Sequence, residues 1–197
     1  VVLDQLSTNS NKIITLNITS PGAEWNILDA LSVSQAAYTE VGTKAAFLNV
    51  ANGGKLQVGG TTELFPGAIL HVSNGGIAEF NGLLQLGKGT AGSGYVDVTA
   101  GGTVTAAGLV LGSETAGPTG NGQVTVDGAG AQLLVRGGTF SGTALYNTSA
   151  SSIAVRNGGL LALTDGAGTD GNVWLKGDVN VDSGGALRMD GGSSLTH

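Results

Sequence analysis

Short runs in which apolar and polar residues alternate recur along most of this chain. In Leu48-Asn49-Val50 and in Leu56-Gln57-Val58 the outer residues are apolar and the central residue is polar, and Gly53-Gly54 stands between the two runs. Alternation with a period of two is typical of a β-strand with one buried face, and paired glycines are typical of a tight turn. The phrase therefore predicts two short strands joined by a turn.

This phrase repeats. Its copies begin at residues 16, 48, 70, 96, 124, 153 and 179, which are 22 to 32 residues apart. Several copies add a third short strand: Leu31-Ser32-Val33, Leu84-Gln85-Leu86, Leu109-Val110-Leu111 and Val173-Trp174-Leu175. The spacing is too irregular for propeller blades and natural for coils whose turns vary in length. We therefore predict an all-β fold, a right-handed parallel β-helix (β-solenoid) of about seven rungs with three short strands each.

The repeat also suggests how the chain is divided. We expect residues 1–12 to be a lead-in or end-cap segment and residues 13–197 to be a single β-solenoid. The last copy stops at Leu187-Arg188-Met189, where a solenoid would leave a strand edge unpaired. For this reason we expect the chain to be a fragment of a longer protein, or its end to be capped by a partner or by a copy of itself.

Two copies have a longer turn than the others. Pro21-Gly22-Ala23 and Gly128-Ala129-Gly130 replace the simple glycine pair. Residues 20–38 also fit an amphipathic helix with Ser20 as its N-cap and Pro21 at its first position. The sequence leaves strand and helix open for this segment.

Asparagine precedes the glycine pair in three of the copies. These residues are Asn52, Asn74 and Asn157. If the turns stack, their side chains could form a ladder in which each amide bonds to the next rung. The sequence therefore suggests an asparagine ladder along one corner.

Composition and charge exclude several classes of protein and partner. The 197 residues include 36 glycines, and 41% are hydrophobic but only 11% are charged, which fits neither a disordered chain nor a helical bundle. The net charge is −6 and the basic residues are scattered, so we expect neither nucleic acid nor an anionic membrane surface as partner. There is no cysteine for a disulfide or a thiolate metal site. No apolar run is long enough to insert into a membrane.

The polar residues do not form a recognisable catalytic constellation. The outward positions of the first and second predicted strands bring no acids together, whereas glycoside hydrolysis needs two carboxylates at a fixed separation. Asp165 and Asp170 lie in a glycine-rich run that is faintly similar to calcium-binding nonapeptides, but one copy of such a run is more typical of a solvated loop. His71 and His197 are isolated. We expect no enzymatic activity, no cofactor and no metal site, with Asp165 and Asp170 as the weak metal candidates.

Three apolar residues stand where alternation points the side chain outward. They are Val110, Leu134 and Trp174. They either pack beneath a long turn, such as 112–122 or 141–151, or form a contact surface for another subunit or a host molecule. The sequence leaves both interpretations open.

Several phrases resemble the glycine-rich repeats of autotransporter passenger domains, of the pertactin-like and haemagglutinin-like kind. They are Gly22-Ala23-Glu24-Trp25, the run 49–54 and the run 122–131. The resemblance covers the chain from about Ile13 onward. It implies a β-helix displayed outside a Gram-negative cell, although no translocator barrel and no serine-protease triad can be placed on this chain.

The resemblance leads to a functional expectation. We expect an extracellular, cell-surface β-helix that acts in adhesion, self-association or as a structural stalk. Its expected partners are host or bacterial surface molecules, glycans or copies of itself, so a homo-oligomer is possible. The alternative is a polysaccharide-binding or polysaccharide-cleaving β-helix, including a segment of a phage tail fibre or spike.

Overall fold

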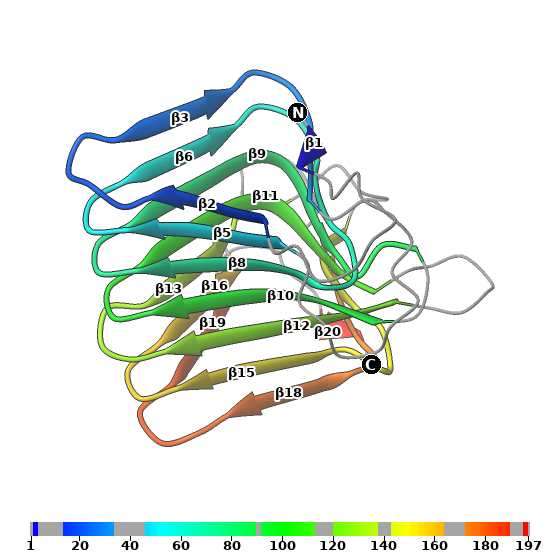
Figure 1. The fold of residues 1–197 in the computed structure, drawn as a ribbon. Helices are drawn as coiled ribbons and strands as arrows, with labels where there is room; N and C mark the ends of the chain where they lie inside the picture. Colours follow the sequence, from blue (N-terminus) through cyan, green and yellow to red (C-terminus); the bar gives the residue numbers. More distant parts are fainter. Residues whose placement is uncertain are drawn as a thin grey trace.

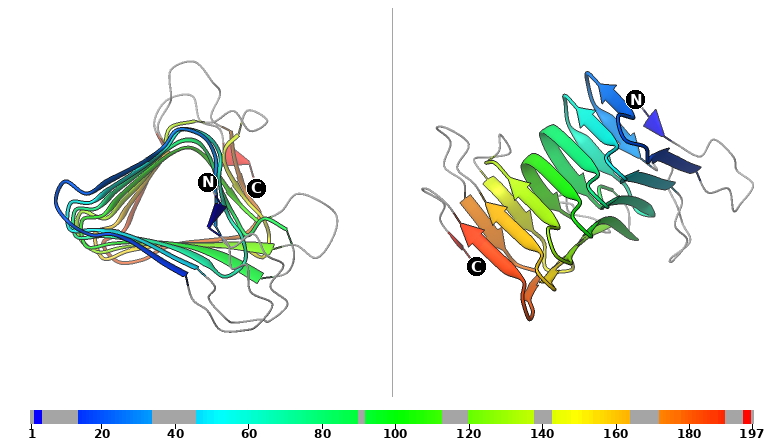
Figure 2. Two further views of the ribbon diagram at one scale, coloured as in Figure 1. Left: turned by 45° about the horizontal axis from the view of Figure 1, so that its top comes forward. Right: turned by 90° about the vertical axis from the view of Figure 1, so that its left-hand side faces the viewer.

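The chain forms a right-handed parallel β-solenoid, as predicted. We describe it from a computed structural model, for residues 2–3, 14–33, 46–89, 92–112, 120–137, 143–163, 172–189 and 195–196. All the regular elements in these ranges are strands, and every strand pairing is parallel. Viewed along the stack, the coils outline a triangle (Figure 2).

Each side of the triangle is a face built from one strand, or one part of a strand, of each coil. The first face is a seven-stranded sheet of β2 (Ile14–Ile18), β5 (Ala46–Ala51), β8 (Ala68–Ser73), β10 (Gly92–Thr99), β12 (Gly120–Asp127), β15 (Ser152–Arg156) and β18 (Asp178–Val181). The second face holds β3 (Glu24–Ile27), β6 (Lys55–Val58), the first parts of β9 (Ile77–Leu86) and β11 (Thr103–Leu111), β13 (Gln132–Val135), β16 (Leu160–Leu163) and β19 (Ala186–Met189). The third face holds β1 (Val2–Leu3), β4 (Leu31–Val33), β7 (Thr62–Leu64), the last parts of β9 and β11, β14 (Thr143–Asn147), β17 (Asn172–Leu175) and β20 (Leu195–Thr196).

The register between coils is the one that the repeat predicts. On the first face Asn17, Asn49, His71, Asp97, Thr125, Ala154 and Asn180 stand in one outward column. The third face has more strands than the sequence indicated, because β1, β7, β14 and β20 were not foreseen. In β7 and β14, the sequences Thr62-Glu63-Leu64 and Leu145-Tyr146-Asn147 place a threonine and an asparagine where the other copies have apolar residues.

Stacked glycine turns form the corner between the first and second faces (Figure 1). In the turn Ser73–Gly76 the first glycine, Gly75, has a φ of 74°. A Cβ on the second glycine, Gly76, would lie 2.6 Å from the carbonyl carbon of Val50 in the preceding coil. The first glycine is therefore required by its backbone conformation, and the second by the close approach of the coil beside it.

The two longer turns explain why alanine occurs at this corner. Ala23 and Ala131 occupy the position of the second glycine, and each donates its backbone N–H to the residue three positions earlier, as Gly76 does. Both turns contain one more residue than the other turns of this corner. Strands β3 and β4 also settle the conformation of residues 24–33, which are not helical, while residues 34–38 lie outside the described residues.

The three predicted asparagines do not form one continuous ladder, although Asn52 does donate its amide N–H to the preceding coil, at the Thr19 carbonyl over 3.4 Å. Asn52 and Asn74 lie in adjacent coils, but Ala100 and the turn that follows Asp127 separate Asn74 from Asn157. Asn157 instead donates its Nδ2–H to Asp127 Oδ1 over 2.8 Å. The three asparagines share a backbone requirement, because their φ angles of 49° to 53° are left-handed and asparagine tolerates that region better than most residues.

The interior is filled by columns of aliphatic side chains. Val50, Val72, Val98, Val126 and Val155 form one column, and all five are fully buried. The large side chain of Phe80 in one coil is accommodated by the small side chain of Ala106 at the same position of the next coil. Each coil buries its apolar side chains against the next coil, so stability is shared between neighbours.

Candidate functional site

The candidate site is an outward column on the third face that changes character along the stack. In coil order the column reads Ser32, Glu63, Gln85, Val110, Tyr146 and Trp174. Its first part is polar and its later part is apolar and aromatic. Alternation alone predicts polar residues throughout, so the second part needs another explanation.

The polar part is held together by side-chain contacts. Ser32 donates its hydroxyl to Glu63 over 3.4 Å, and Lys88 forms an ion pair with the same carboxylate. These contacts match donors to acceptors in adjacent coils. Because Lys88 neutralises the Glu63 carboxylate and Ser32 bonds to it, the polar part of the column is explained by contacts within the fold.

The aromatic part forms a patch together with one lysine. Tyr146 and Trp174 are direct neighbours on β14 and β17, and 39% of Trp174 is exposed. Lys176 follows β17, where its backbone N–H bonds to the carbonyl of Asn147. Its ammonium lies 5.6 Å from the ring centroid of Tyr146 and 6.0 Å from that of Trp174, and it donates to the Tyr146 hydroxyl over 3.4 Å. We call Tyr146, Trp174 and Lys176 the aromatic patch.

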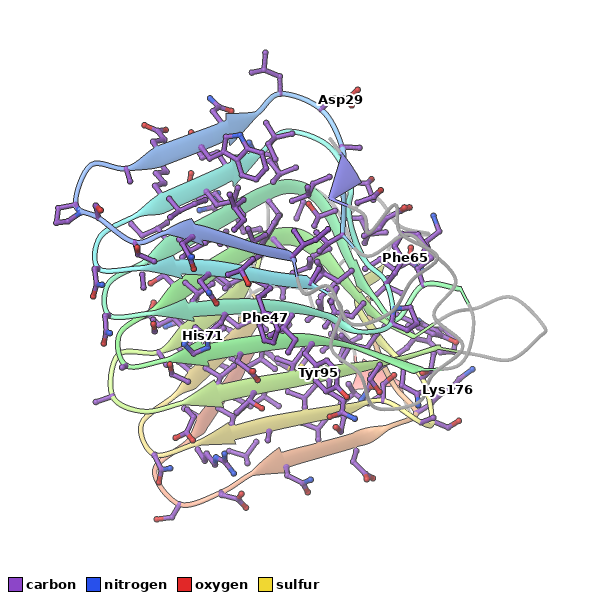
Figure 3. The ribbon with its side chains drawn as sticks, in the orientation of Figure 1. Asp29, Phe47, Phe65, His71, Tyr95 and Lys176 are labelled. Atoms are coloured by element: carbon purple, nitrogen blue, oxygen red, sulfur yellow. The ribbon has the colours of Figure 1, made fainter. Side chains whose placement is uncertain are left out.

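Lys176 lies at the corner between the third and first faces (Figure 3). Within the described ranges, no carboxylate oxygen lies within ion-pair distance of its ammonium. Three other basic side chains do have such partners, since Lys55 pairs with Glu79, Lys88 with Glu63 and Arg156 with Asp127. The aromatic patch therefore combines exposed ring surface with a cation supported by π-systems.

The structure brings together only two of the three predicted contact residues. Val110 stands in the same column as Trp174, one coil beyond Tyr146, but only 1% of it is exposed. Leu134 lies on the second face between Thr105 and Ala162, which are both buried. Leu134 therefore does not extend the aromatic patch, and Val110 lies next to Tyr146 without adding exposed surface. Asp165 and Asp170 lie outside the described residues.

Sequence reasoning missed Tyr146 and Lys176, although a signal existed for Tyr146. Tyr146 is the centre of Leu145-Tyr146-Asn147, a third strand whose last residue breaks the apolar pattern. Had the strand been recognised, its register would have placed Tyr146 beside Trp174. Lys176 had no signal, because its position depends on how the chain leaves β17.

A second aromatic strip was missed on the first face. Phe47, Ile69 and Tyr95 stand in register at outward positions of β5, β8 and β10. Phe47 and Tyr95 are partly exposed, whereas Ile69 between them is 3% exposed. Figure 3 shows Phe47 and Tyr95 on the same face as His71. Extending each predicted strand by one residue toward its start would have revealed this strip.

The perturbed carboxylates belong to the scaffold. Glu79 accepts from Gln57 over 2.5 Å and pairs with Lys55 at 3.1 Å, and these contacts, the Gln57 hydrogen bond first, lower its pKa. Hydrogen bonds from Asn157 and Arg156 lower the pKa of Asp127. The contacts of each carboxylate link adjacent coils, and the lowered pKa keeps both carboxylates charged at neutral pH. These contacts therefore stabilise the stack.

The described part of the chain holds no group of three or more histidine and acidic side chains that could bind a metal ion. It also contains no helix that is long and apolar enough to cross a membrane.

Comparisons with known proteins add little to this geometry. Neither a family model nor a curated protein matches the sequence. One solved structure is similar, that of a TibC-catalyzed hyper-glycosylated TibA fragment, at 17% identity and a TM-score of 0.24. The similarity covers 98% of this chain and 72% of that one.

Proposed function

We propose that this chain is a non-enzymatic β-helix of a bacterial cell surface, of the autotransporter-passenger kind, and that it acts in adhesion. The observation that supports this proposal is the aromatic patch. Exposed aromatic residues are enriched where proteins bind partners, and here two aromatic rings and a cation lie together. Trp174 is 39% exposed and has Tyr146 and Lys176 beside it.

The scaffold suits such a role. Each coil adds one strand to each face at a spacing of roughly 4.8 Å, so side chains in one column form a straight row. Inter-coil hydrogen bonds and the buried aliphatic columns hold that row rigid. A rigid row of outward side chains loses little conformational entropy when it contacts a surface.

Bead retention tests this proposal. Beads coated with the chain are applied to bacterial and epithelial cell layers and to a surface coated with the same chain, which separates attachment to cells from self-association. We expect Trp174→Ala to lower retention several-fold. Leu28→Ala is the matched control, because Leu28 is an apolar residue that is 87% exposed and directly follows β3, several coils away from β14 and β17.

Two results would overturn the proposal. One is equal retention of the wild type, Trp174→Ala and Leu28→Ala on every surface. The other is the release of reducing ends or unsaturated uronates from a panel of acidic polysaccharides, which would favour the rival function of a polysaccharide-cleaving β-helix.

A further inference from the structure

We infer that the aromatic patch binds an acidic sugar, with the sugar ring on Trp174 and its carboxylate on Lys176. This inference rests on the proposed contact function and names the ligand class of the same site. It is carried by two features of the patch, the lysine ammonium and the exposed indole ring. Trp174 lies on β17, and Lys176 follows two residues later, just after the strand ends.

The cation sets the charge of the ligand. The Lys176 ammonium contacts two rings and the Tyr146 hydroxyl, and within the described residues it has no carboxylate partner. Lysine is a compact cation with three donors, and a carboxylate can accept from it in a charge-assisted hydrogen bond. One lysine suits one carboxylate, whereas a nucleic-acid backbone needs clustered basic residues.

The rings set the shape of the ligand. The face of an aromatic ring carries negative charge density and attracts the weakly positive C–H groups on the face of a pyranose ring. Tyr146 and Trp174 stand on adjacent coils, roughly 4.8 Å apart along the stack. A single sugar ring can therefore cover Trp174 while its substituents reach Tyr146 and Lys176.

The strand pairing argues against an acidic peptide as the ligand. A peptide commonly binds a sheet by adding a strand to a free edge. The edges of β17 are occupied, since β17 pairs with β14 on one side and β20 on the other. A ligand can therefore contact only side chains on this face. The exposed surface of Trp174, Tyr146 and Lys176 is small and flat, so it fits one or two sugar rings better than a polypeptide surface.

Isothermal titration of the full chain tests this inference with matched pairs of probes. Trigalacturonate is compared with its methyl ester, and 3′-sialyllactose with lactose, because uronic and sialic acids are two sources of the same chemistry. Tetraglutamate is the peptide probe. We expect at least one acidic sugar to bind in the millimolar range or tighter, and its neutral counterpart to bind about tenfold more weakly. Lys176→Gln should remove that difference and the salt dependence of binding, and Trp174→Ala should abolish binding.

The unfolding midpoint of each variant is measured to show that the variant is folded. Leu28→Ala serves as the control for a change of an exposed apolar side chain. Equal binding of the acid and its neutral counterpart would overturn the inference, as would tetraglutamate binding as tightly as the sugars. If no acidic sugar binds while bead retention still depends on Trp174, the inference fails and the adhesive function stands. If an acidic sugar binds but Trp174→Ala leaves bead retention unchanged, the sugar site is confirmed and the adhesive function fails.

Discussion

The two glycines of one corner turn should respond very differently to the same substitution. Gly75 and Gly76 are adjacent, and in both Gly75→Ala and Gly76→Ala a single methyl group is added. At Gly75 nothing lies within 4 Å of the new Cβ, so the cost is the left-handed φ of 74°. That strain is about 1–2 kcal/mol, and the lower entropy of alanine in the unfolded chain offsets part of it, which leaves about 1 kcal/mol.

At Gly76 the cost comes from the neighbouring coil. The new Cβ would lie 2.6 Å from the Val50 carbonyl carbon and 2.9 Å from the Cα of Ala51, and real Cβ atoms essentially never approach other atoms to less than 3.0 Å. Both neighbours are backbone, so the coils must move apart. The adjacent hydrogen bond from Ile77 N–H to the Gly54 carbonyl, 3.0 Å long, would be stretched. Overpacking at about 1–3 kcal/mol and a weakened hydrogen bond between coils at about 1–2 kcal/mol together give about 2–5 kcal/mol.

Urea unfolding followed by far-ultraviolet circular dichroism measures both costs. We expect Gly76→Ala to lower the free energy of unfolding by about 1–4 kcal/mol more than Gly75→Ala does. A small domain is stabilised by only about 5–15 kcal/mol, so this difference is readily detected. Equal losses for the two variants, or a larger loss for Gly75→Ala, would refute the separate roles assigned to the two glycines.

Three further predictions concern the scaffold. Ala100 has a left-handed φ of 44°, so Ala100→Asn should raise the free energy of unfolding by about 0.5–1 kcal/mol, and a lower midpoint in thermal unfolding would contradict this. Phe80→Ala should cost about 3–5 kcal/mol in chemical unfolding, because Phe80 is 2% exposed and its neighbour in register, Ala106, cannot fill the cavity; a loss below about 1 kcal/mol would show that the core collapses. The folded-state pKa of Glu79 is lowered, so the carboxylate stabilises the fold above its unfolded pKa and this contribution is lost as the pH falls through the folded pKa. Stability measured from neutral to acidic pH should therefore fall less in Glu79→Gln than in the wild type, by up to about 1 kcal/mol, and identical profiles would rule out the contribution.

The repeat determined the architecture of this protein without help from tertiary structure. A parallel solenoid places equivalent residues of successive repeats side by side, so aligning the copies in the sequence also aligns them in space. The outward column from Asn17 to Asn180 follows directly from that alignment, and the pairings between coils match it. The glycine turns were recognisable for the same reason.

Only the tertiary structure decided which outward residues form a surface together. The sequence gives the same signal for Trp174, Val110 and Leu134, an apolar residue at an outward position. In the structure Leu134 lies on another face and Val110 is buried. Lys176 joins Tyr146 and Trp174 because of how the chain turns after β17, and the repeat does not encode that turn. Strand alternation fixes whether a side chain points inward or outward, whereas its exposure and its partners depend on the neighbouring coils and on the connections between them.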